Sequence, residues 1–251
     1  HSEAPSPVSA LLSGALLNCA FVGILRVFQV CSAAGLHDFA AHWLIVFGLI
    51  SLVVSAALLI QQRDYKRMLA FSSIEHMGLL AVGSAVGGLG AQGAMLHMLT
   101  HSFTKSSLFL TAGNILQHYG TKQVRQVRSL LGRAPRDAFF WICGLLAISG
   151  IPPFGTFISE FLIVRGLFDD GRNWVAAAVL LLLTLVFAAM SSIMLRMTFG
   201  PVRDRRTVRS SLWQWAGTGG LLAIVVLLGV QPPRGLLELM SSAAGLFGGR
   251  P

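Results

Sequence analysis

The sequence predicts an all-α, polytopic membrane protein with about seven transmembrane helices. Of its 251 residues, 54% are hydrophobic and only 12% are charged, and the mean hydropathy is +0.70. This charged share is about half that of an ordinary soluble domain, which excludes a soluble globular protein and a disordered chain. The apolar residues gather into seven long windows. Those windows contain only five charged residues: Arg26, Glu75, Lys105, Glu160 and Arg196.

The seven windows define the membrane domain that we expect, residues 1–230, followed by a tail, residues 231–251. Each window is long enough to cross about 30 Å of hydrocarbon at about 1.5 Å per residue. Backbone polar groups in lipid must be satisfied internally, so the windows are predicted as helices, and they are too long and evenly apolar for barrel strands. The windows are 8–30, 43–60, 68–86, 91–116, 138–164, 174–199 and 212–230.

The first three windows carry few polar groups. Pro7 suits the first turn of helix 8–30, and Arg26 near its end is expected to reach the membrane interface. Helix 43–60 has no charged residue. In helix 68–86, Glu75 and His76 point about 100° apart, so they need not pair, and they are candidates beside a proton relay. Lys66 precedes this helix and is interpreted as a solvated anchor, with proton transfer as a secondary role.

Helix 91–116 carries a polar stripe. His97, His101 and Lys105 follow i, i+4, i+8 spacing, which places them on one face over about 12 Å. Three groups that exchange protons near neutral pH, aligned at membrane depth, indicate a proton relay. Ligation of haem or a metal by the two histidines is a weaker alternative, because each would need a partner elsewhere and no second helix has paired histidines.

Window 138–164 is predicted to break into two half-helices at Gly150, Pro152 and Pro153. Irregular backbone at membrane depth is tolerated where it is buried or lines a cavity. A broken helix near an acidic residue is a recurring device of ion pathways in transporters. Glu160 follows this break and is therefore a candidate proton carrier, with a purely structural, hydrogen-bonded carboxyl group as the alternative.

The last two windows and the connections predict the topology. Arg196 near the end of 174–199 is expected to reach the interface. Connections 61–67, 117–137 and 200–211 hold twelve of the nineteen Lys and Arg residues, whereas 31–42 and 87–90 hold none. The positive-inside rule places the three basic connections in the cytoplasm, the N-terminus inside and the C-terminus outside a cell's inner membrane. The net charge of +9 is thus a topology signal rather than a nucleic-acid patch.

Segment 117–137 and the three cysteines bear on the binding partners of the chain. Segment 117–137 could form an amphipathic surface helix, which would contact anionic lipid or dock an acidic soluble partner. Cys19, Cys31 and Cys143 are far apart, without the close pairs of iron–sulfur or zinc sites. We expect no metal, cofactor or catalytic residue in this chain.

Several strings together resemble a known family: residues 1–12, 64–73, 97–110 and 150–160. They are similar to the antiporter-like proton-translocating subunits of respiratory complex I, Mrp-type antiporters and energy-converting hydrogenases. Residues 73–78 and 101–105 look closest to component F of hydrogenase-4 and formate hydrogenlyase complexes. The resemblance covers residues 1 to about 200 and places the chain at helices 8–14 of such a subunit.

The resemblance implies residue roles. Lys105 would lie on a central axis with His101 and His97 beside it, and Glu160 would be the terminal proton carrier on the broken helix. Asn18 stands where one branch of the family has a lysine. This implies that water or the Asn18 amide links the first half-channel to the central axis. The Glu–Lys pair of the family's first half would lie upstream, so the chain would hold the second half-channel and part of the axis.

The resemblance therefore implies a proton-translocating membrane subunit of a redox-driven complex, namely a [NiFe] hydrogenase of the hydrogenase-4 or formate hydrogenlyase type. Its nickel–iron and iron–sulfur centres would lie in partner subunits, membrane and soluble. The alternatives are a complex I subunit, or an Mrp-type subunit that moves Na⁺ as well as protons. From other classes, a haem-ligating cytochrome and a non-conducting assembly fragment remain open.

Overall fold

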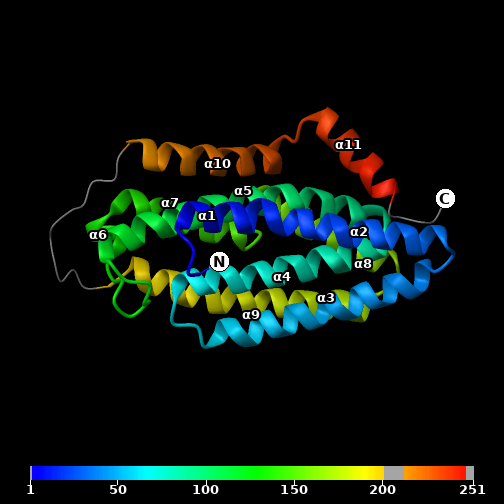
Figure 1. The fold of residues 1–251 in the computed structure, drawn as a ribbon, viewed down its shortest axis with the longest axis horizontal. Coiled ribbons are helices and arrows are strands. Elements are labelled where there is room, and N and C mark those ends of the chain that lie inside the picture. The colour runs from blue at the N-terminus through cyan, green and yellow to red at the C-terminus, as the bar shows by residue number, and fades with distance from the viewer. Residues whose placement is uncertain (1, 201–211, 247–251) are drawn as a thin grey trace.

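The computed structural model describes residues 2–200 and 212–246, and its regular structure in these ranges is helical (Figure 1). Helix α1 (Ser6–Leu11) continues through a π-helical segment (Leu12–Leu16) into α2 (Leu17–Ala33). The others are α3 (His37–Ile60), α4 (Tyr65–Val86), α5 (Gly88–Tyr119), α6 (Leu130–Arg133), α7 (Pro135–Ile148), α8 (Gly155–Asp169), α9 (Asn173–Thr198), α10 (Leu212–Val230) and α11 (Arg234–Gly245).

The helices confirm the prediction of an all-helical, polytopic membrane protein. Each of the seven predicted windows coincides with a helix, or, for window 138–164, with the pair α7 and α8. By length and hydropathy, four helical spans could cross a membrane: Ser6–Ala33, α3, α4 and α9. The pair α10–α11, bent by 76°, makes a possible fifth. Helices α7 and α8 are individually short because the predicted break divides them.

Helix α5 runs through the centre of the bundle. It packs against α4 and α8, and also against α1, α7 and α10, whereas α3 packs mainly on α4 and α9 (Figure 1). Glycines bring the helices close together. A Cβ atom on Gly78 of α4 would lie 2.7 Å from the carbonyl oxygen of Gly48 on α3. Small residues at helix crossings allow this close backbone approach, which van der Waals contact favours in membranes.

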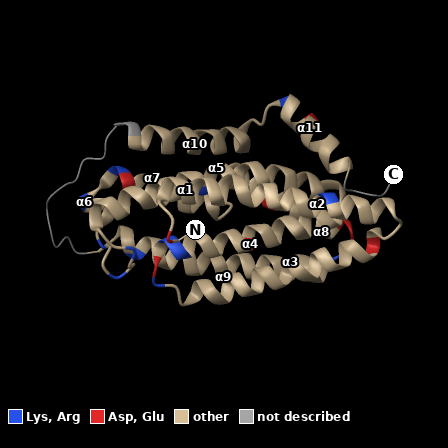
Figure 2. Cartoon of the chain, in the orientation of Figure 1, with Lys and Arg blue, Asp and Glu red and all other residues tan. Residues whose placement is uncertain are grey.

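Two of the three basic connections, 61–67 and 117–137, meet at one end of the bundle. The Tyr65 amide donates to the Lys122 carbonyl (3.2 Å), and the Val124 amide donates to the Arg63 carbonyl (2.9 Å). A cavity at this end is lined by residues of both connections and by Arg196 near the end of α9. Figure 2 shows most charged residues at the ends of the bundle. Arg203, Arg205, Arg206 and Arg209 lie outside the described residues.

Segment 117–137 differs from the amphipathic helix that we considered. Only Leu130–Arg133 forms a helix between α5 and α7. Val124, Val127 and Leu130 are buried in the same cluster as Tyr65 and Trp141. The segment is therefore a loop fastened to the end of the bundle, and its basic side chains surround this apolar anchor. The tail, in turn, contains helix α11, which the sequence analysis did not predict.

Candidate functional site

The polar stripe of α5 faces the interior of the bundle. His97, His101 and Lys105 are all 0% exposed. They face α4, which is also buried on this side, so that two antiparallel helices enclose a polar row within an apolar protein. Ionisable groups at membrane depth are costly unless they are paired or face a wet cavity. The partners of each side chain therefore indicate what the row can do.

Lys105 forms hydrogen bonds only across to α4 among the described residues. Its Nζ donates to the carbonyl oxygen of Leu69 (2.8 Å) and to Oγ of Ser72 (2.5 Å). Ser72 also donates to the Leu69 carbonyl (3.2 Å). Both partners of the amine are neutral oxygens. The amine can thus give up or accept a proton without dismantling a direct ion pair.

Three histidines come together one to two helical turns from Lys105. His76 Nδ1 lies 3.0 Å from His97 Nε2, in hydrogen-bonding contact. The ring of His101 lies 5.0 Å from that of His76 and 6.3 Å from that of His97, centroid to centroid. Neither ring nitrogen of His101 has a hydrogen-bond partner among the described residues. His76 thus lies between the two histidines of the α5 stripe, a position that sequence spacing did not reveal.

Glu75 lies at the edge of the histidine cluster. Its Oε2 is 3.8 Å from Nε2 of His76, so these sequence neighbours approach each other although they point in different directions from the helix. With Glu160 and Ser149, Glu75 also lines a small cavity of about 20 Å³. A cavity of this size holds about one water molecule. Two carboxyl groups from different helices therefore share one potentially hydrated space.

The predicted helix break is confirmed between α7 and α8. Helix α7 ends at Ile148 and α8 begins at Gly155, with Pro152 and Pro153 in the connection. Gly150 has φ of +59°, a left-handed conformation that favours glycine. A Cβ atom there would overlap the carboxyl group of Glu160. The break thus makes room for this carboxyl group beside the turn.

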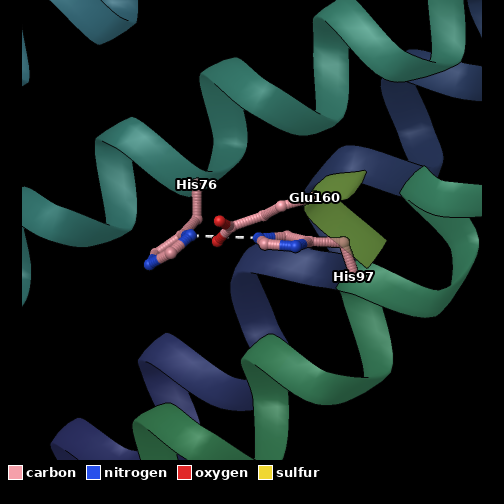
Figure 3. Close-up of side chains that lie close together, drawn as sticks. All are labelled: His76, His97 and Glu160. Carbon is pink, nitrogen blue, oxygen red and sulfur yellow. Dashed lines mark hydrogen bonds between the residues drawn. The ribbon is translucent and has the colours of Figure 1, made fainter. Parts of the chain in front are cut away.

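Glu160 reaches the histidines from α8. Figure 3 shows the carboxyl group beside His76 and His97, and one ligand atom from each residue lies within 4.8 Å of the others. His97 Nδ1 also lies 2.8 Å from Oγ of Ser159. Sequence spacing singled out Glu160 and both histidines but did not predict their contact. It missed Ser159, which only its position beside Glu160 on the broken helix could have suggested.

The two secondary candidates lie at the α1–α2 face of the site. Lys66 is only 1% exposed and its Nζ donates to the carbonyl oxygen of Ala4 (2.7 Å). The interpretation of a solvated anchor was therefore wrong, because the N-terminal segment covers this side chain. Asn18 Nδ2 donates to the Met98 carbonyl (2.8 Å) and to Ser102 Oγ (2.6 Å), which joins α2 to α5.

The fold and site together define a polytopic helical membrane protein that carries a buried row of titratable side chains beside a broken helix. The chain belongs to the membrane-subunit family described as NADH:quinone oxidoreductase/Mrp antiporter, which matches residues 1–188. This family membership agrees with the resemblance that the sequence motifs carry.

Individual relatives span several complexes. The chain is 38% identical over 213 residues to a hydrogenase-4 component F homolog of Methylacidiphilum infernorum, covering 84% of this chain and 44% of the relative. It is 31% identical over 256 residues to NADH-quinone oxidoreductase subunit M of Pseudomonas aeruginosa, covering 99% and 48%. The chain thus spans about half the length of these curated relatives.

Solved structures show the same fold. A chain of the archaeal membrane-bound sulfane sulfur reductase superposes with a TM-score of 0.89 at 21% identity, covering 98% of this chain and 50% of that one. A chain of the Mrp complex from Dietzia sp. gives 0.84 at 22%, covering 96% and 53%. Respiratory complex I from Thermus thermophilus gives 0.79 at 26%, covering 90% and 50%.

Proposed function

We propose that the chain carries part of the proton path of a redox-driven membrane complex, of the hydrogenase-4 type. The observation that supports this most directly is the row of side chains that runs from the buried Lys105 through three buried histidines to the partly buried Glu160. It crosses three helices, α5, α4 and α8. Within it, His76 and His97 are in hydrogen-bonding contact, Glu160 offers an oxygen within 4.8 Å of a nitrogen of each, and the ring of His101 lies 5.0 Å from that of His76.

Protons would move along this row by short transfers between neighbouring groups. His76 and His97 already share a hydrogen bond, and their rings can each release one proton at one nitrogen while accepting another at the second. Glu160 would exchange protons with this pair and with water in the cavity that it shares with Glu75. The imidazole nitrogens favour the proton over Na⁺, because hard cations bind oxygen ligands.

Substitution of the two ends of the row tests this proposal. In the assembled complex, reconstituted into vesicles with a pH-sensitive dye, Glu160→Gln and Lys105→Ala are expected to lower proton pumping. Asp169→Asn provides a matched control, because this carboxyl group is 58% exposed at the end of α8 and lies outside the row. Wild-type pumping by an assembled Glu160→Gln complex would contradict the proposal.

The partner complex supplies the chemistry in this proposal. The hydrogenase-4 assignment is supported by the component F relative, and a complex I assignment is supported by the subunit M relative that covers nearly the whole chain. Nickel–iron and iron–sulfur centres would lie in other subunits, with none in this chain. Purification of the intact complex separates the two candidates: a [NiFe] hydrogenase subunit favours the first, and an NADH-reactive arm favours the second.

We propose that the complex lies in the inner membrane of the cell and that the basic end of the bundle faces the cytoplasm. The gathering of basic connections at one end supports this orientation through the positive-inside rule. The test introduces a cysteine at Arg125 or at Trp174, which is 90% exposed at the start of α9, in a background lacking Cys19, Cys31 and Cys143. An impermeant maleimide added outside intact cells should label position 174 and spare position 125.

A further inference from the structure

We propose that His76, His97 and Glu160 form a binding site for a borderline transition-metal ion, best matched by Zn²⁺, and that the bound ion blocks the proton path. Two histidines and one carboxylate are a common protein ligand set for zinc. The three side chains come from three helices and converge on one point (Figure 3). The blocking part rests on the proposed function, whereas the binding part rests on the ligand geometry alone.

The distances fit a tetrahedral ion. The three candidate ligand atoms lie within 4.8 Å of one another, and the two histidine nitrogens are 3.0 Å apart. Bonds of about 2.0–2.1 Å at tetrahedral angles separate two ligand nitrogens by about 3.3 Å. The two nitrogens therefore need to separate by only a few tenths of an ångström, while both rings tilt so that their lone pairs point at the ion instead of at each other. The Glu160 oxygen, within 4.8 Å, closes the third bond when its side chain rotates toward the ion.

The surroundings of His97 leave the correct nitrogen available. Ser159 Oγ donates its hydrogen to the Thr156 carbonyl (2.8 Å), so it can only accept from His97 Nδ1, 2.8 Å away. The His97 proton is thereby held on Nδ1, and Nε2 is left bare toward His76 and Glu160. A hydrogen-bonded second nitrogen that fixes the tautomer is the usual arrangement behind a metal-bound histidine.

His76 has a matching arrangement. Without an ion, its Nδ1 must carry the hydrogen shared with the bare Nε2 of His97. An ion at this point replaces that hydrogen, and the proton of His76 then resides on Nε2. This nitrogen has no hydrogen-bond partner among the described residues, but it faces the Glu75 carboxylate 3.8 Å away. Glu75 thus stands where a carboxylate can accept the hydrogen of the second ring nitrogen and so orient a metal-bound histidine.

The fourth coordination position can be filled by water. Glu160 lines the cavity of about 20 Å³ that it shares with Glu75 and Ser149, which has room for about one water molecule. Two imidazole ligands select against Na⁺, Mg²⁺ and Ca²⁺, which prefer oxygen, and favour zinc and its neighbours in the first transition row. The ion occupies both nitrogens that would otherwise pass the proton, so it interrupts the row at its centre.

The test measures Zn²⁺ binding by the whole purified complex, by equilibrium dialysis with radioactive zinc. Wild type should bind one more Zn²⁺ per complex than His97→Ala or Glu160→Gln, provided that the variants assemble. His42→Gln serves as the matched control, because His42 is an exposed histidine on α3 and should leave the number unchanged. Ser159→Ala should weaken the affinity about 10- to 100-fold by releasing the His97 tautomer.

A measurement on wild type protects the test against misfolding of the variants. X-ray absorption of the zinc-loaded wild-type complex should show nitrogen and oxygen neighbours at about 2.0–2.1 Å and the outer scattering of imidazole rings. Equal zinc numbers in wild type and in assembled His97→Ala, or a zinc spectrum without imidazole scattering, would overturn the site.

Pumping measurements separate the two proposals. Zn²⁺ at saturating concentration should stop proton pumping by wild-type complex in vesicles, and a chelator should restore it. The metal site is confirmed if His97→Ala binds one zinc fewer than wild type. If wild-type pumping is nevertheless undiminished at saturating Zn²⁺, the bound ion does not block the path, and these histidines are not at its centre. Failure of zinc to bind would leave the pumping experiment with Glu160→Gln unaffected.

Discussion

Helices α3 and α4 lie side by side and are nearly equal in length, yet they are built in opposite ways. Within their most apolar stretches, 33% of α3 is buried inside the protein against 67% of α4. Helix α3 exposes large apolar side chains such as Phe47, Ile50 and Val53, whereas α4 buries Glu75 and His76. Helix α9, with 28% buried, resembles α3.

The comparison shows how an apolar solvent inverts the usual distribution of side chains. Lipid gives no hydrophobic force to bring helices together, so close packing and interhelical hydrogen bonds do so. Large apolar side chains can therefore remain on the outside, and the costly polar groups gather where they satisfy one another. The site exists because α4, α5 and α8 share this polar interior.

A charge on the outer helix should produce the largest effect. Ile50→Arg places a guanidinium at the middle of α3 on a side chain that is 50% exposed. Arginine at a helix centre costs about 3 kcal/mol on insertion scales. We expect a large fall in membrane-inserted protein, measured by alkaline extraction of membranes, whereas Ile50→Leu should insert like wild type. Normal insertion of the arginine variant would show that this face is not in lipid.

The contact between the two helices should give the next largest effect. Gly78→Ala places a methyl group 2.7 Å from the Gly48 carbonyl, which forces α3 and α4 apart. Overpacking of this kind costs about 1–3 kcal/mol. Gly23→Ala in α2 is the matched control, because no atom lies within 4 Å of its added Cβ. The Tm of the purified complex should fall for the first variant only.

Removal of the interior charge should change stability much less. In Lys105→Met, the Leu69 carbonyl keeps its hydrogen bond from Ser72 Oγ, and a similar apolar volume replaces the amine. We expect a change within about 1 kcal/mol, seen as a small shift in Tm, together with lost pumping. A collapse of assembly would instead assign Lys105 a structural role and weaken the contrast with α3.

The smallest effect should come from the exposed pair at the basic end. The hydrogen bond and charge of Lys122, 2.9 Å away, hold the pKa of the Glu3 carboxyl below its usual range. A lowered folded-state pKa stabilises the protein above the unfolded pKa, and this contribution disappears as pH falls through the folded value. Glu3→Gln should therefore lower Tm slightly at neutral pH and not at acidic pH. Since Glu3 is fully solvated, high salt should abolish the difference.

The helices and the break could be predicted because both depend on local sequence. Long apolar windows require helices in lipid, and Pro152 and Pro153 cannot continue one. The burial of the stripe from His97 to Lys105 could also be predicted from the sequence, because three polar groups on one face of a membrane helix need a polar neighbour. Its functional role remains a prediction that the pumping experiment tests.

The contacts between helices could not be predicted, because they depend on which faces meet. Sequence spacing gives the angle between Glu75 and His76 on α4, but not the helix that either one faces. The proximity of His76 to His97 arises when α4 packs on α5, and that of both to Glu160 arises when α8 packs across these two helices. The burial of Lys66 was missed for the same reason, since its cover is the N-terminal segment, some 60 residues away.

During synthesis, the loop before α4 and the loop after α5 can pair only once α5 has been made. The bridge between Asp64 and Gln123 joins residues on either side of this helical hairpin. Before that moment, α4 alone would present Glu75 and His76 to the lipid. The bridge thus closes a helical hairpin whose two polar faces satisfy each other, whereas neither helix alone has a partner for these groups in lipid.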